Sequence, residues 1–348
     1  MADEDQAGGT AAPWCVSHDV ATASRAMGAI LAVLASLILA ANVPVAIVLL
    51  CHIHRSGSKG LCFVLNLALA DAMVGFAVMG VAADELSQPF YPSQNFCVLR
   101  MAFVTSSCAA SILSLILVAC DRHLAIRKPF HYLQLVTALR VGLCLLGLWL
   151  LAAVLGFLPV FIPRFQRVSN HWKCSFFNVF HPSYMLTLFC LGFFPALFLF
   201  FYLYCDMLKV AWGHERHIQQ VKPAGLAGGG PAAPRAGSDT KAMRTVAALI
   251  GCFTASWLPF FIASVVQMLC PECFPYRLIE NFLWLLGLGN SLLNPLLYSY
   301  WQRDVQLQLS QLAAALRRRV LLHLGHGRCF PGRDTKALPA VSCLELQD

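Results

Sequence analysis

The chain has 348 residues, of which 58% are hydrophobic and only 12% are charged. This charged fraction is about half that of a soluble domain, which excludes an ordinary water-soluble enzyme or binding module. The net charge of +8 comes from an uneven distribution of lysine and arginine along the chain, so it does not indicate nucleic-acid binding.

Long uncharged stretches predict seven membrane-spanning helices. A helix needs about 20 apolar residues to cross about 30 Å of hydrocarbon. Six stretches of this length contain no Asp, Glu, Lys or Arg, and a seventh contains only Asp71. We therefore predict an all-α membrane protein, a seven-transmembrane helix bundle. The predicted spans are 26–51, 60–83, 101–120, 141–163, 182–205, 245–271 and 281–302.

The positive charges predict the orientation in the membrane. Nineteen of the 25 lysines and arginines fall in the tail and in loops on the side of the C-terminus, and such loops face the cytoplasm. The Gly-, Pro- and Ala-rich stretch at about 212–240 is expected to be a flexible linker. The predicted segments are an extracellular segment 1–25, a transmembrane domain 26–300, a short segment 301–316 and a disordered cytoplasmic tail 317–348.

Four cysteines lie near the predicted outer face, where the environment is oxidising. A bridge from Cys97 at the start of the third helix to Cys174 would hold the following loop over the bundle. Cys270 and Cys273 in "CPEC" favour a local disulfide. A zinc site is the weaker alternative, because no nearby pair of Cys or His completes four ligands.

Polar residues inside the membrane are costly and call for an explanation. Asp71 lies mid-helix, and Ser111 is expected at the same depth. Asn290, Asn294 and Tyr298 share one face of the last helix. Asp71, Ser111, Asn290, Ser291 and Asn294 either bind a small cation such as Na⁺ or only fix packing by hydrogen bonds.

Four prolines mark expected bends in the helices, because proline removes a backbone donor and kinks a helix. They are Pro159, Pro195, Pro259 and Pro295. Trp257 lies two residues before Pro259, where it is either a large core residue or a side chain that senses a ligand.

These motifs together resemble the rhodopsin-like (class A) G-protein-coupled receptors along about 26–316. The resemblance implies a receptor and not an enzyme, with a short amphipathic eighth helix at 301–316 after the seven-transmembrane helix bundle. It rests on motifs found in order on successive helices. They are Asn42, "LALAD" ending at Asp71, Cys97, "DRH" at 121–123, Trp149, Pro195, "SWLP" at 256–259 and "NPLLY" at 294–298.

Further stretches, among them "MAFVTSS", "CSFF", "YCDMLK" and "NSLLNPL", resemble the lipid-amide-responsive members of that family. This resemblance implies a plasma-membrane receptor for fatty-acid ethanolamides and lysophosphatidylcholine. It also implies coupling to the stimulatory G protein, activation of adenylyl cyclase, rising cyclic AMP, insulin and incretin secretion, and arrestin as a further partner.

An aromatic and aliphatic ligand cavity is expected at the outer end, because no acidic residue lies between Arg100 and Asp121 to bind an amine. Glu85, Arg100 and Glu280 near its mouth would meet a polar head group. The alternative is that the aromatic residues face lipid or core and that Arg100 reaches to the membrane interface. The remaining candidates are Met101, Val104, Thr105, Phe176, Phe177, Trp257, Phe260, Phe261, Asn281 and Trp284.

At the inner end, Arg122 is expected to pair with Asp121 or with Asp239, although both charges would be weak partners if solvated. Phe130 after Pro129 is expected to be an exposed anchor for a G protein. His123 stands where the family has tyrosine, a departure that the sequence does not explain.

Two other classes of function remain as alternatives. A transporter or channel could use the Asp71 polar seam as an ion path, but the chain shows no internal repeat. An intramembrane enzyme is disfavoured, since Ser111 has no neighbouring base. No cofactor is expected beyond Na⁺.

Overall fold

The computed structural model describes residues 13–87, 93–167, 174–221, 234–270 and 278–301, with separate residues between 306 and 318. In 13–21, 211–221 and 234–245, and at 280, 300 and 301, only the backbone is described. The structural statements below concern these residues. Cys273, half of the predicted eighth helix and all but two residues of the predicted tail lie outside them.

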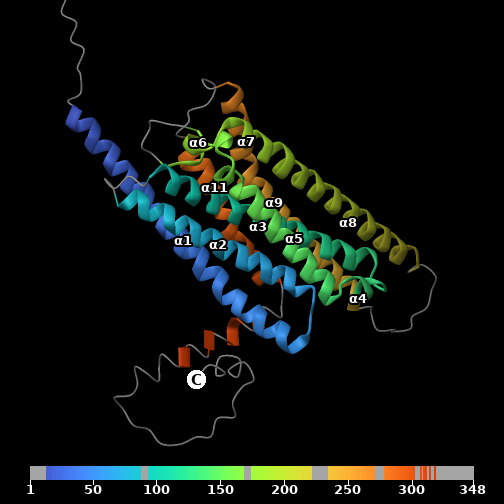
Figure 1. Ribbon diagram of the computed structural model, residues 1–348. Helices are drawn as coiled ribbons and strands as arrows, with labels where there is room; N and C mark the ends of the chain where they lie inside the picture. Colours follow the sequence, from blue (N-terminus) through green and yellow to red (C-terminus); the bar gives the residue numbers. More distant parts are fainter. Residues whose placement is uncertain are drawn as a thin grey trace, which may run out of the picture.

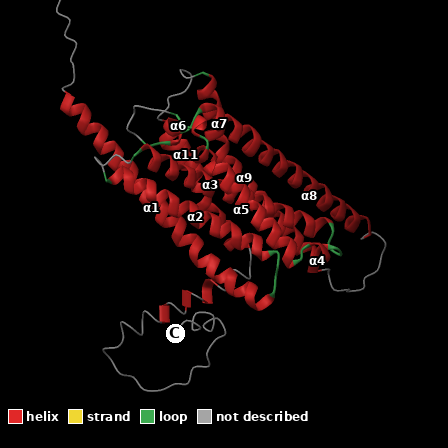
Figure 2. Ribbon diagram, in the orientation of Figure 1, coloured by secondary structure: helices red, strands yellow, loops and turns green. Residues whose placement is uncertain are grey.

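Seven long helical segments run side by side in an elongated bundle (Figure 1). The described residues form helices joined by short loops, with one isolated antiparallel bridge between Gln166 and Phe180 (Figure 2). The long helices are α1 (Pro13–Ser56), α2 (Leu61–Leu86), α3 (Gln94–Arg127), α5 (Ala138–Phe161), α8 (Phe194–Val221), α9 (Pro234–Leu269) and α11 (Trp284–Trp301).

Short helices connect and extend the long ones. They are α4 (Tyr132–Leu135), the 3₁₀ turn η1 (Pro163–Phe165), α6 (Phe176–Val179), α7 (Pro182–Leu188), and the π-helical turns η2 (Phe189–Phe193) and η3 (Ile279–Leu283). The η2 turn joins α7 to α8 next to Pro195, whose missing N–H interrupts the regular hydrogen-bond ladder. Such π turns are frequently found at functional sites.

The predicted helix bundle is confirmed. Six segments are long and apolar enough to cross a membrane. The seventh, η3 with α11, contains Asn290 and Asn294, which lower its hydropathy.

Several boundaries differ from the prediction, because a helix continues beyond the membrane as long as its backbone hydrogen bonds are made. The first helix begins at Pro13, inside the segment predicted to precede the bundle. The last turns of α8 and the first turns of α9 occupy 212–221 and 234–240, so the predicted linker is largely helical.

The faces of the helices divide between core and membrane. More than half of the apolar window of α2 and of α3 is buried, against 22% of that of α5. Helix α5 exposes Leu139, Leu143 and Leu150, as expected where lipid is the solvent. Small residues allow the close crossing of α3 and α5. A Cβ at Gly156 would lie 2.6 Å from the Ser106 nitrogen, so no larger residue fits there.

A disulfide marks one end of the bundle. Cys97 at the start of α3 is bonded to Cys174, with 5.7 Å between their Cα atoms, which confirms the predicted pair. Cys270 at the end of α9 is also disulfide-bonded. We call this the disulfide end, and the opposite end, where α3 finishes, the Arg122 end.

Candidate functional site

A large apolar cavity lies between α3, α5, η2, α9 and α11 toward the disulfide end. Its empty space is about 770 Å³ when the open solvent at its mouth is counted. Seven of the predicted ligand contacts line it. They are Val104, Thr105, Phe176, Trp257, Phe260, Phe261 and Trp284.

Packed aromatic rings form one wall of this cavity. Phe261 of α9 stacks on Phe193 with 3.7 Å between ring centroids and meets the edge of Phe189 at 4.6 Å. The Trp257 ring lies 5.6 Å from Phe261 and 5.9 Å from Phe260. The wall joins the π turn η2 to the middle of α9, so displacing one ring displaces its neighbours.

A second cavity of about 490 Å³ lies beside the first, and Phe176, Phe260 and Trp284 line both. Glu85 lines the second cavity, is 9% exposed and accepts a hydrogen bond from the Ser24 hydroxyl of α1. This cavity therefore pairs apolar walls with one buried acidic group. Met101, Phe177 and Asn281 also line it.

The structure places Arg100 away from both cavities. Its guanidinium forms an ion pair with Asp84 of α2, donates to the Gly80 carbonyl at 2.8 Å and lies over the Phe96 ring at 4.6 Å. These contacts satisfy its charge within the α2–α3 interface. Arg100 is thus not positioned for the expected contact with a head group, whereas Glu85 is.

The predicted polar residues meet in the middle of the bundle. Asp71, fully buried, accepts a hydrogen bond from the Ser111 hydroxyl at 2.6 Å and another from the Asn294 amide at 3.0 Å. Ser291 is buried as well. The side-chain oxygens of Asn290 and Asn294 are buried without a hydrogen-bond partner, and Asn294 is in direct contact with the Asp71 carboxylate through its amide nitrogen.

We call Asp71, Ser111, Asn290, Ser291 and Asn294 the polar core. Further buried polar residues follow it along α11 toward the Arg122 end. The Asn42 amide donates to the Ser291 carbonyl at 2.9 Å, and the Tyr298 hydroxyl donates to the Asn42 side-chain oxygen at 3.4 Å. Asn42 and Tyr298 are both buried. These bonds support the structural interpretation of Asn42, since they tie α1 to α11.

At the Arg122 end, Asp121 accepts three hydrogen bonds. The Arg122 Nε and Nη2 donate to it at 2.9 and 2.5 Å and the Tyr132 hydroxyl at 2.7 Å. A Cβ on Gly60, the residue before α2, would collide with the Tyr132 hydroxyl, so this cluster packs closely against the start of α2. Burial and the hydrogen bond to Asp121 raise the pKa of the Tyr132 hydroxyl.

Arg122 is therefore held by its own neighbour, one of the two partners expected for it. The alternative partner, Asp239, lies in the part of α9 for which only the backbone is described. For Glu280, too, only the backbone is described.

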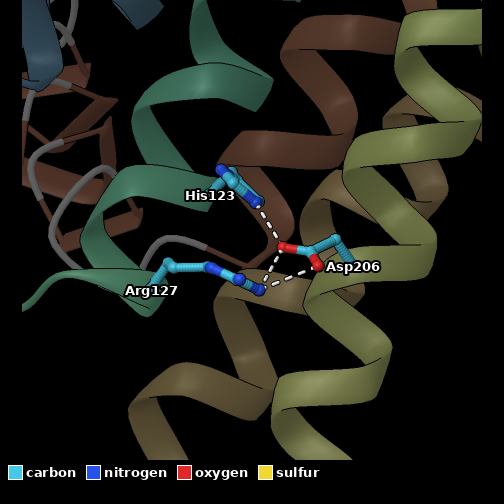
Figure 3. A network of polar contacts seen from close by, with 3 residues as sticks. All are labelled: His123, Arg127 and Asp206. Carbon is cyan, nitrogen blue, oxygen red and sulfur yellow. Dashed lines mark hydrogen bonds and ion pairs between the residues drawn. The ribbon is translucent and has the colours of Figure 1, made fainter.

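An unpredicted junction explains His123. Figure 3 shows His123 and Arg127 of α3 reaching the same carboxylate, Asp206 of α8. The His123 Nε2 lies 2.8 Å from an Asp206 oxygen, and the Arg127 guanidinium donates at 2.7 and 2.8 Å. The only hint in the sequence is an acidic residue at the end of the apolar stretch 182–205.

Phe130 projects into the open at this end, with 83% of its surface exposed, and Pro129 beside it is exposed as well. An exposed aromatic ring among Arg127, Lys128 and His131 suits a protein contact better than a folding role. The described geometry is thus consistent with the expected anchor.

The sequence of the chain is similar to those of known proteins. Residues 14–298 match the family described as 7 transmembrane receptor (rhodopsin family). The chain is 50% identical to the human glucose-dependent insulinotropic receptor over 90% of this chain and 95% of the human one. It is 50% identical to the rat receptor of that name over 84% of this chain and 63% of the rat one. The 5-hydroxytryptamine receptor 4 of Cavia porcellus is 31% identical over 70% of this chain and 67% of its own.

These relatives are receptors, which removes the intramembrane enzyme and leaves the transporter without support. The membrane-spanning helices and the family together make this a multi-pass protein of the plasma membrane. The chain belongs to the rhodopsin-like (class A) family of seven-transmembrane G-protein-coupled receptors.

Proposed function

We propose that this receptor binds lipids with an acyl chain and an uncharged or zwitterionic head group, namely fatty-acid ethanolamides and lysophosphatidylcholine. The observation that carries the proposal is the apolar lining of the first cavity, in which Val104 stands on the α3 wall and Trp257 and Trp284 contribute aromatic surface. Such a lining favours an acyl chain over an amine.

The second cavity would take the head group. Glu85 is an acceptor for the hydroxyl and amide donors of an ethanolamide, or an anion for the quaternary ammonium of a choline. A free fatty acid would place its carboxylate against this buried acid, where two like charges repel. The proposed head-group site therefore favours amides and choline lipids over acids.

Signalling would follow from the contact of the bound ligand with the α9 side chains that line the cavity. A ligand that displaces Trp257 and Phe261 would favour an outward position of the inner half of α9. It can do so only by binding that state more tightly than the resting one. The Arg122–Asp121–Tyr132 cluster would open with this movement and leave Arg122 and an apolar groove for the G protein.

The partner we propose is the stimulatory G protein, with arrestin as a second partner of the same surface. The Arg122 end then faces the cytoplasm and the disulfide end faces outward, as the positive charges indicate. In this setting the receptor would raise cyclic AMP. The name of its 50% identical relative suggests insulin and incretin secretion as the outcome.

We also propose that Na⁺ binds in the polar core. Asp71 supplies a negative charge, Ser111 and Ser291 supply hydroxyl oxygens, and Asn290 and Asn294 supply carbonyl oxygens that otherwise lack partners. Oxygen ligands of this kind suit a hard cation. Its charge would offset that of the buried carboxylate and favour the resting packing of α2, α3 and α11.

The test is cyclic AMP in cells that express the chain with the stimulatory G protein. Oleoylethanolamide and lysophosphatidylcholine are expected to raise it in a dose-dependent way, and oleic acid is expected to be much weaker. Cells with an empty vector provide the control. No rise above that control with any lipid, at a verified surface level of receptor, would refute the proposal.

A further inference from the structure

Gly287 of α11 lies directly against the Trp257 ring of α9. A Cβ at this position would lie 2.6 Å from two carbons of the six-membered part of the indole and 2.9 Å from a third. Ordinary contact begins at 3.4 Å, so a methyl group there requires a movement of about 0.8 Å. The rest of the indole is enclosed, since Phe261 and Phe260 pack on it and Trp257 is only 6% exposed.

The position of Gly287 along α11 connects two parts of the receptor. Trp284, three residues earlier, lines both cavities. Asn290, three residues later, belongs to the polar core around Asp71. Residues three apart lie on the same side of a helix. The Trp257 ring therefore touches α11 between the cavity and the polar core, one turn from each.

We propose that Gly287 is a positioning residue that sets the resting place of the Trp257 ring, and through it the agonist-free activity of the receptor. This inference rests on the proposed function, because it concerns the ring that the ligand is proposed to displace. Without a Cβ at 287, the six-membered part of the indole packs closely against α11 in the state where Arg122 is held by Asp121. A side chain at 287 would exclude the ring from that place.

The direction of the effect follows from which state the added group destabilises. A methyl group at 287 overpacks the resting state, in which the ring contacts α11. It does not penalise a state in which the ring has left that contact. The equilibrium then shifts toward the displaced ring, as it would with an agonist that binds that state. The receptor should signal without ligand.

The experiment is a double-mutant cycle with a matched control. Gly287→Ala is combined with Trp257→Phe, which removes the ring carbons that the methyl group would strike. Gly289→Ala is the control, because it adds the same methyl group to the same helix, where no atom lies within 4 Å. Agonist-free cyclic AMP and surface receptor are measured for each variant, along with the response to oleoylethanolamide.

We expect Gly287→Ala to raise agonist-free cyclic AMP per surface receptor about five-fold or more, and Gly289→Ala to stay within about two-fold. In the Trp257→Phe background the effect of Gly287→Ala should fall to about two-fold or less, because contacting residues are energetically coupled. If Gly287→Ala reduces surface receptor instead, Trp257→Phe should restore the level.

Equal effects of Gly287→Ala in both backgrounds, or a Gly287→Ala receptor that behaves like Gly289→Ala, would overturn the inference. So would a loss of surface receptor that Trp257→Phe does not repair. The proposed function fails in a different way, since the wild-type receptor would then show no cyclic AMP response to any lipid.

Discussion

Truncation of Phe130 is expected to reduce G-protein coupling without affecting the folding of the receptor. Its side chain is 83% exposed, so truncation to alanine removes almost no internal contact. Substitutions at such positions usually change stability by no more than about 0.5 kcal/mol. We therefore expect the Phe130→Ala receptor to reach the surface and to bind oleoylethanolamide like the wild type.

The cost should appear only when the G protein binds. Burying an exposed phenylalanine in a partner contributes about 1.5–3 kcal/mol, and a central aromatic anchor at an interface loses 2 kcal/mol or more on truncation. Since 1.4 kcal/mol is a factor of ten, the apparent affinity for the G protein should fall roughly tenfold or more. A lower maximal cyclic AMP response at limiting G protein would report it.

Phe161→Ala is the matched control. Phe161 is 79% exposed and ends α5 at the disulfide end, far from the proposed G-protein surface. Both variants lose one exposed ring from the receptor, so a general effect on membrane insertion would appear in both. Unchanged nucleotide exchange on the G protein with Phe130→Ala, or an equal loss with Phe161→Ala, would refute the anchor role.

Three other substitutions test separate parts of the account. Asp206→Asn weakens the acceptor that His123 and Arg127 share and so loosens α8 from α3. It should raise agonist-free cyclic AMP about two- to five-fold. Lower agonist-free and maximal cyclic AMP at an equal surface level of receptor would show that the junction supports the active state instead. Asp71→Asn should abolish any difference in agonist affinity between NaCl and KCl, and a difference that persists would place Na⁺ elsewhere. Trp284→Ala should shift the oleoylethanolamide dose–response curve about tenfold to higher concentration, since the Trp284 ring lines both cavities. An unshifted curve would show that Trp284 is not part of the ligand site.

The helix bundle and the polar core around Asp71 could be predicted from the sequence, because a charged residue in a membrane span and an unpaired polar group inside the bundle both cost free energy. Uncharged stretches of 20 or more residues fix the number of spans, and a buried carboxylate such as Asp71 must find donors. The ends of the helices could not be predicted in this way. Beyond the membrane α1, α8 and α9 continue in polar sequence, where hydropathy no longer separates helix from loop.

The contacts between helices were predicted less well than the residues on them. Arg100 was expected at the ligand and is held by Asp84, because sequence does not say which side of α3 faces α2. His123 was unexplained until α8 was seen to bring Asp206 beside it. These pairs depend on the rotation of each helix about its axis, which the apolar pattern of a membrane helix specifies only weakly.

The central claim is that lipid binding in the cavity activates the stimulatory G protein directly. It is tested by nucleotide exchange on purified G protein with purified receptor in lipid nanodiscs, without other cellular components. The account predicts that oleoylethanolamide accelerates exchange in a dose-dependent way and that Trp284→Ala shifts its curve. Exchange that stays at the receptor-free rate at saturating oleoylethanolamide and lysophosphatidylcholine would contradict it.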